Sequence, residues 1–213
     1  MKIRQLAFTA FAACALFGAS QASAQTIGFK IGASFANVSG DDVDEDTETL
    51  TSLMGGGFIR FGMGPIGIQP EVLFVTRGWK VEDDAEDVTG KFKADYIEVP
   101  ILAVLPLSLG AGIAPYVFAG PSFAFNIGCT LSGESEGVSV DADCEDFGFD
   151  LKSTDIGATL GGGLEFPMGP GALLVEGRYN FGLSNIADFE DADVKTRTAA
   201  ILAGYSIPLG PRM

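Results

Sequence analysis

The side chains that could do chemistry in this chain are charged groups that stand in the middle of apolar segments. The 213 residues contain no histidine, so the commonest general base and the commonest metal ligand are both absent. A nucleophile activated by histidine is excluded for the same reason, and acid–base work would fall to a carboxylate pair such as Glu71 and Glu98. The charges within apolar segments are Lys30, Arg60, Glu71, Arg77, Glu98, Glu165, Glu176 and Arg178.

The segments that carry these charges alternate apolar and polar residues, and acidic or turn-rich stretches separate them. Near the start, Ile27 and Phe29 share one face of an extended chain while Lys30 lies on the other. A period of two residues predicts β-strands. The expected strands are residues 26–37, 51–63, 66–79, 92–105, 113–127, 153–166, 172–183 and 196–209.

Two features of these strands favour a membrane barrel over a soluble sheet, which would show the same alternation. The polar face is rich in glycine and carries the charges, as a narrow lumen requires, while the other face carries Phe, Ile, Leu and Val. The strands also reach the roughly nine to eleven residues that cross a bilayer at a tilt. We therefore predict an all-β fold, an eight-stranded antiparallel up-and-down transmembrane β-barrel with its apolar side toward lipid and Gly, Glu and Arg inside.

A membrane-spanning helix is the competing interpretation for residues 99–133, which carry no charge. Pro100, Pro106, Pro115 and Pro121 would interrupt any helix in this stretch, because proline lacks the amide hydrogen and clashes with the preceding turn. Two strands joined by a tight turn fit the same residues without that conflict.

The connections between the expected strands are of two kinds that alternate along the chain. Gly64-Pro65, residues 106–112 and residues 167–171 are short and uncharged. The other four connections hold 22 of the 28 acidic residues, in residues 41–48, 82–87, 134–150 and 188–193. Short turns at one end and long loops at the other are typical of outer-membrane barrels, so we expect extracellular loops and both termini on the periplasmic side.

Residues 1–24 have the composition of a secretory signal peptide. Two basic residues precede a short apolar stretch, and Ala22 and Ala24 form a small-residue cleavage site. We expect this segment to be removed and residues 25–213 to form one barrel domain in the outer membrane of a Gram-negative-type bacterium.

The mature segment holds two cysteines, Cys129 and Cys144. An even number of cysteines in an exported protein predicts a disulfide, here within one outer loop.

The chain as a whole is acidic and apolar, with a net charge of −15 and a mean hydropathy of +0.29. The acidity argues against nucleic acid as a partner, because phosphate would be repelled. The hydropathy fits contact with outer-membrane lipid.

Several stretches of the chain resemble a known family. They are QPEVLF at residues 69–74, YIEVPIL at 96–102, PYVFAGP at 115–121, GGGLE at 161–165, EGRY at 176–179 and GLSNI at 182–186. On these stretches the chain resembles the porin-like PorT family of outer-membrane β-barrel proteins, found in Bacteroidetes-like bacteria. The resemblance implies a location in the outer membrane and no defined activity.

Two interpretations fit the charges within the strands: a path for protons or ions, or a structural network. Buried charges are costly unless they are paired, and an eight-stranded barrel is narrow enough for its own side chains to fill. We expect a structural network in the lumen, with no open pore, no catalytic residues, no cofactor and no metal site.

The acidic loops are the remaining candidate for function. Aspartates at positions 42, 44 and 46 resemble the start of a calcium-binding loop, but Thr47 stands where that loop needs glycine. We expect a monomer with a structural or interaction role, whose loops contact a protein partner or divalent cations. The alternatives are a soluble periplasmic β-barrel that binds a small apolar ligand, and an outer-membrane enzyme acting on lipid or peptide.

Overall fold

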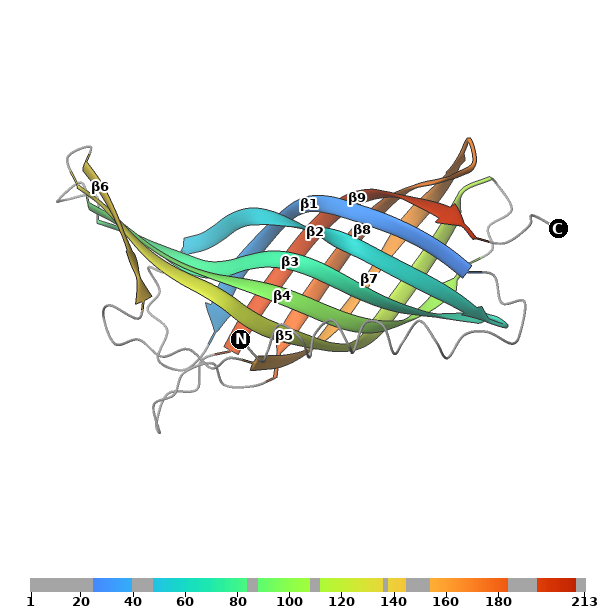
Figure 1. Ribbon diagram of the computed structural model, residues 1–213, viewed down its shortest axis with the longest axis horizontal. Coiled ribbons are helices and arrows are strands. Elements are labelled where there is room, and N and C mark those ends of the chain that lie inside the picture. Colours follow the sequence, from blue (N-terminus) through green and yellow to red (C-terminus); the bar gives the residue numbers. More distant parts are fainter. Residues whose placement is uncertain are drawn as a thin grey trace, which may run out of the picture.

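The strands of this chain close into one antiparallel barrel, as the computed structural model in Figure 1 shows. The structure describes residues 25–39, 48–83, 88–107, 112–135, 138–144, 154–183 and 195–209. The predicted signal peptide and most of the four acidic segments lie outside these ranges. Within them, no helix has the length and hydropathy needed to span a membrane.

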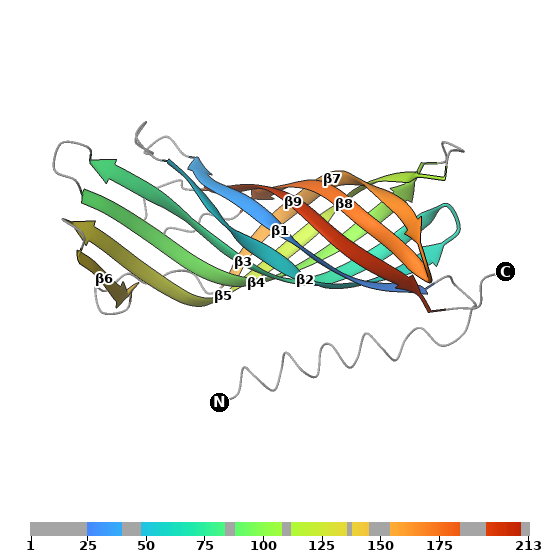
Figure 2. The ribbon, with the colours of Figure 1, turned by 90° about the horizontal axis from the view of Figure 1, so that it is seen from above.

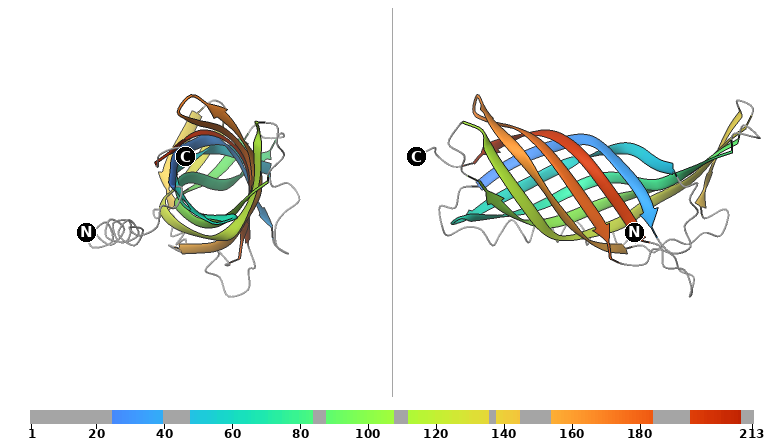
Figure 3. Two further views of the ribbon diagram at one scale, coloured as in Figure 1. Left: turned by 90° about the vertical axis from the view of Figure 1, so that its right-hand side faces the viewer. Right: turned by 180° about the vertical axis from the view of Figure 1, so that it is seen from behind.

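The described strands are β1 (Gln25–Ser39), β2 (Glu48–Met63), β3 (Ile66–Asp83), β4 (Val88–Pro106), β5 (Ala114–Ser135), β6 (Val138–Asp143), β7 (Thr154–Met168), β8 (Gly171–Gly182) and β9 (Lys195–Pro208). All of these except β6 form the wall of the barrel. The sheet closes because β1 pairs with both β2 and β9, and β4 pairs with β5. Seen end-on in Figure 3, the wall forms a ring, and the predicted eight-stranded antiparallel barrel is confirmed.

Two of the short connections are two-residue hairpin turns with the same sequence, Gly-Pro. Met63 pairs with Ile66 around the first turn, and Met168 pairs with Gly171 around the second. The leading glycine has a φ of 70° in the first turn and 59° in the second. A positive φ at this position matches the twist of the flanking strands and is open to glycine at no steric cost. The turns therefore fix the register of β2 with β3 and of β7 with β8.

The outer surface of the barrel is an apolar belt. Phe29 is 60% exposed, and Leu53 and Ile201 are each 62% exposed. Large apolar side chains point outward from every strand of the wall, and their alternate neighbours are buried. This surface suits lipid and would be costly in water.

The belt ends on five strands where the outward residues change from apolar to polar. The changes are Leu53 to Thr51 in β2, Phe74 to Thr76 in β3, Ile97 to Asp95 in β4, Ile156 to Thr154 in β7 and Ala199 to Arg197 in β9. From this boundary to the short turns, the belt covers residues 66–74 of β3, 53–63 of β2 and 199–209 at β9. These lengths match the roughly nine to eleven residues that cross a bilayer.

Three strands continue well beyond this boundary. β3, β4 and β5 stay paired as far as Asp83, Val88 and Ser135, and β6 adds to the free side of β5. Figures 1 and 2 show this extension, with β6, projecting from one end of the barrel. We call β6 together with residues 78–83, 88–93 and 128–135 the protruding sheet.

The protruding sheet corrects the expectation that residues 82–87 and 134–150 are loops throughout. Their acidic composition favoured a loop. However, apolar Val138, Val140 and Ala142 alternate with polar residues, and this period of two continues the ladder of β5. Cross-strand pairing outweighs the low strand propensity of the acidic residues.

The lumen also differs from expectation, because it contains large apolar side chains as well as Gly, Glu and Arg. One buried cluster comprises Met54, Leu73, Val75, Ala94, Tyr96, Ala124, Ala200 and Leu202. A second, near the short turns, comprises Leu102, Val104, Tyr116 and Phe118. The barrel is thus packed along its length by its own side chains.

Candidate functional site: a charge network inside the barrel

The eight charged residues singled out in the sequence all lie on lumen-facing positions of the barrel wall. They come from six strands, β1, β2, β3, β4, β7 and β8, and each makes an ion pair. The pairs form three groups at successive levels between the short turns and the protruding sheet. Alternation along each strand places these side chains inside, because their neighbours face lipid.

The central group joins two cations and two carboxylates. Lys30 Nζ lies 2.9 Å from Glu71 Oε1 and 2.8 Å from Glu176 Oε2. Arg178 Nη2 lies 2.8 Å from Glu71 Oε2, a close ion pair outside hydrogen-bond geometry, and Arg178 Nε donates to Glu176 Oε1 at 2.8 Å. Tyr116 also donates to Glu176 Oε2, at 3.1 Å. Side chains of the four charged residues are at most 2% exposed, so the group is a neutral, buried quartet.

The group nearest the protruding sheet has one guanidinium between two carboxylates. Arg77 Nη1 lies 2.9 Å from Asp155 Oδ2, and Arg77 Nη2 pairs with Glu98. Asn180 Nδ2 donates to Glu98 Oε1 at 3.0 Å, and Thr196 Oγ1 donates to Asp155 Oδ2 at 3.2 Å. Amide and hydroxyl donors thus supplement the single cation.

Asp155 was missed by sequence reasoning as a member of this network. It follows an acidic stretch and stands at the start of its strand, so composition assigned it no partner. Its place on the same face as Thr159 and Glu165 was the available signal.

The group nearest the short turns is partly exposed. Arg60 Nη1 lies 2.5 Å from Glu165 Oε1, and these side chains are 17% and 21% exposed. Arg60 Nε donates to Gln69 Oε1 at 2.6 Å, and Gln69 Nε2 donates to Glu71 Oε1 at 2.6 Å. Gln69 therefore links this group to the central quartet.

Each of the four cations in the network also lies over an aromatic ring. Distances to the ring centroids are 4.8 Å for Lys30 over Phe58, 5.1 Å for Arg60 over Tyr116, 5.3 Å for Arg77 over Tyr96 and 5.5 Å for Arg178 over Phe118. Such contacts attract the cation to the face of the ring and restrict its motion. Ion pairs and rings together hold the cations in place across the lumen.

The rings in turn need glycine beneath them. A Cβ on Gly161 would stand 2.4 Å from the ring of Phe118, and one on Gly28 would stand 2.5 Å from the ring of Phe58. Glycine on the lumen face is therefore a packing requirement at these two positions.

Glu71 and Glu98, the candidate acid–base pair, belong to different groups. Glu71 contacts Lys30, Arg178 and Gln69, whereas Glu98 contacts Arg77 and Asn180. They share no partner in these contacts, and both carboxylates are committed to cations.

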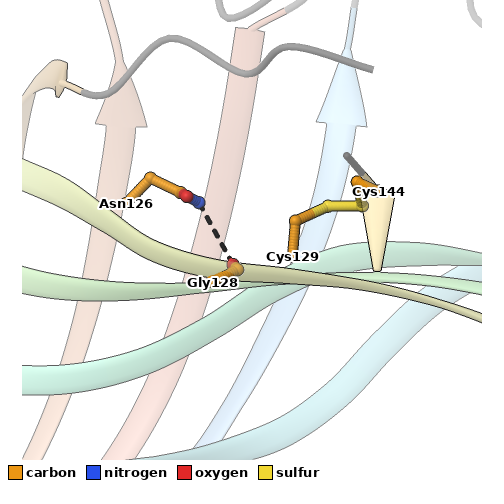
Figure 4. The surroundings of a disulfide bond; sticks show 4 residues. All are labelled: Asn126, Gly128, Cys129 and Cys144. Atoms are coloured by element: carbon orange, nitrogen blue, oxygen red, sulfur yellow. Dashed lines mark hydrogen bonds between the residues drawn. A yellow bond between two sulfur atoms is a disulfide. The ribbon is translucent and has the colours of Figure 1, made fainter. Parts of the chain in front are cut away.

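The two cysteines form a disulfide at the base of the β5–β6 hairpin, as predicted, shown in Figure 4. Their Cα atoms are 5.5 Å apart, and the next pair in the register is Thr130 with Asp143. Asn126 Nδ2 donates to the carbonyl of Gly128 at 3.3 Å beside it. Aspartates 42, 44 and 46, considered for calcium, lie outside the described residues.

Comparison with solved structures finds small outer-membrane barrels, although no curated protein matches the chain. Neisserial surface protein A is 16% identical with a TM-score of 0.48, over 85% of this chain and 96% of that one. The attachment invasion locus protein Ail of Yersinia pestis is 19% identical with a TM-score of 0.44, over 86% and 99%. OprG of Pseudomonas aeruginosa is 11% identical with a TM-score of 0.48, over 87% and 97%.

The family assignment rests on a family model rather than on these neighbours. The model described as "outer membrane protein beta-barrel domain" matches residues 19–188, well over half of the chain. The chain therefore belongs to the outer-membrane β-barrel domain family, as a small barrel of eight antiparallel strands.

Proposed function

We propose that this protein is a sealed outer-membrane barrel that acts as a structural or interaction element through its extracellular side. The observation that carries the proposal is the charge network, which crosses the lumen at three levels with its cations paired. An ion entering the barrel would have to break these pairs and displace the apolar clusters beside them. Removing one partner from a buried pair costs about 3–5 kcal/mol, so this passage is strongly disfavoured.

The interaction role is supported by what stands beyond the lipid belt. The protruding sheet rises past the boundary at Thr76 and Asp95, and the sequence segments that hold most of the acidic residues connect strands whose described ends lie on this side of the barrel. An acidic surface of this kind suits a basic protein partner or bridging divalent cations.

Finer assignments belong to the same proposal. Residues 1–24 act as a signal peptide, the acidic loops are extracellular, and the barrel is a PorT-family protein that works as a monomer without enzymatic activity or cofactor. The soluble ligand carrier fits poorly, because the family is one of outer-membrane barrels and the outer face is apolar.

Conductance of the purified protein in planar lipid bilayers tests the sealed lumen. We expect no stable current steps from the wild-type barrel, and the same silence from Lys93→Ala, whose side chain lies outside the lumen. Removing the central cations in Lys30→Ala/Arg178→Ala should produce current steps in whatever fraction still inserts. Reproducible steps from the wild type would overturn the proposal. Turnover of lipid or peptide substrates, lost in Glu71→Gln, would favour the enzyme instead.

A further inference from the structure

The outer edge of β6 is a strand edge without a neighbour among the described residues. β6 pairs with β5 from Thr130 with Asp143 to Ser135 with Val138, and it stands last in the strand order. Within the part of the chain that the structure describes, its backbone therefore forms a ladder on one side only. An unpaired edge of this kind presents N–H and C=O groups that can pair with another extended chain.

This edge stands clear of the membrane. Residues 128–135 of β5 lie beyond the last exposed apolar residue of that strand, Ile127. Eight residues of strand extend about 25 Å, given a rise of roughly 3.3 Å per residue. Figures 1 and 3 show β6 at the far end of the protruding sheet, away from the ring of the barrel. A partner in the surrounding medium would reach it without entering lipid.

The hairpin that carries the edge is held in a fixed register. Six residue pairs join β6 to β5, and the disulfide between Cys129 and Cys144 closes the hairpin at its base. On its other side β5 stays paired with β4 from Val88 with Ser135 to Asp95 with Gly128. A partner therefore meets an ordered edge, which lowers the entropy lost on binding.

The sequence around the edge defines the charge of such a partner. Residues 129–150 contain seven acidic residues and no lysine or arginine. We propose that the free edge of β6 binds an extended, positively charged polypeptide, which adds to the protruding sheet as a further strand. Backbone pairing would provide the affinity and the acidic surroundings would select for positive charge. This inference rests on the proposed interaction role and names the class of partner.

Charged residues on an edge strand can also serve to prevent pairing, so the test must separate the two roles. The probes are three labelled peptides offered to the full-length barrel in lipid nanodiscs. One alternates Lys and Val, a second alternates Glu and Val, and a third has the charge of the first with proline at alternate positions. Binding is followed by fluorescence anisotropy, and hydrogen exchange is followed at residues 138–143.

Strand addition predicts that the Lys-Val peptide binds at least tenfold more tightly than the other two and slows exchange in β6. Equal binding of the proline peptide, or binding without protection of β6, would overturn strand addition. Absence of binding would also overturn strand addition, and would show that the acidic residues prevent other chains from pairing with β6.

Variants locate the binding edge. Adjacent residues of a strand present their N–H groups to opposite edges, so one of Ser139→Pro and Val140→Pro removes a donor from the free edge only. That variant should lose at least tenfold in affinity for the Lys-Val peptide. Its barrel should still be folded, as shown by a different mobility of heated and unheated samples in SDS gels. Unchanged affinity in both would contradict the inference. Conductance measured on the same samples keeps this result separate from the proposed function. A barrel that passes no current and binds no peptide would refute strand addition at β6 and leave the sealed lumen standing.

Discussion

The membrane-spanning part of the barrel and the protruding sheet share three strands, yet the outward face of these strands is apolar in the first region and polar in the second. Within the belt, β3 exposes Phe74 and buries Glu71 against cations. Beyond the boundary, the outward side chains are polar, and Thr76 donates to Asp95 Oδ1 at 2.6 Å. The inner side there carries Phe92, which packs on the apolar cluster of the lumen. The same two-residue alternation thus continues from lipid into water, and the polarity of the outward side chains indicates which of the two they contact.

The largest expected effect comes from breaking the buried quartet. Arg178→Ala leaves Glu71 and Glu176 with Lys30 as their remaining cation, so we expect a loss of about 3–5 kcal/mol in the free energy of unfolding. Urea titration of the barrel in lipid vesicles measures it. Arg60→Ala, at a partly exposed pair, should cost less. Arg197→Ala, on an exposed arginine outside the lumen, should change stability by at most about 0.5 kcal/mol. Similar losses in all three variants would refute the ranking by burial.

A lysine introduced on the outer face tests where the boundary between the two regions lies. Ile101 is 44% exposed near the middle of the belt on β4, so Ile101→Lys should cost about 2–4 kcal/mol. The same substitution beyond the boundary, Thr51→Lys, should be close to neutral because this outward residue is exposed at the polar side of the boundary. Unfolding in lipid vesicles compares them. Equal costs at the two positions would mean that the boundary is misplaced.

A smaller effect tests the packing of rings on glycine inside the lumen. Gly161→Ala puts a methyl group 2.4 Å from both the carbonyl oxygen of Gly177 and the ring of Phe118, and we expect a loss of about 1–3 kcal/mol from overpacking. Gly177→Ala is the matched control on the adjacent strand, since a Cβ there meets no atom within 4 Å. Unfolding free energies that change equally for both would exclude close packing at Gly161 as the cause.

The sequence predicted most of the barrel wall and the charged residues of the lumen, because these follow a plain alternation. Lys30 lies between outward Phe29 and Ile31, and a charge in that setting has only the lumen to face. The apolar lumen clusters were not predictable in the same way. Leu73 and Val75 alternate with Val72 and Phe74, so both faces of this stretch are apolar. The sequence pattern therefore does not distinguish the lipid-facing residues from the lumen-facing ones. The protruding sheet was missed because acidic composition masked its alternation.

The central claim is that alternate residues of one strand face lipid and lumen. Residues 72–75 of β3 are the sharpest test, because all four are apolar and the sequence does not show which of them face lipid. Nuclear magnetic resonance of the barrel in nanodiscs doped with spin-labelled lipid measures which side chains contact acyl chains. The structure predicts strong broadening of Val72 and Phe74 and little broadening of Leu73 and Val75. Broadened Leu73 and Val75 beside protected Val72 and Phe74 would mean that the barrel is inside out, and would contradict the account.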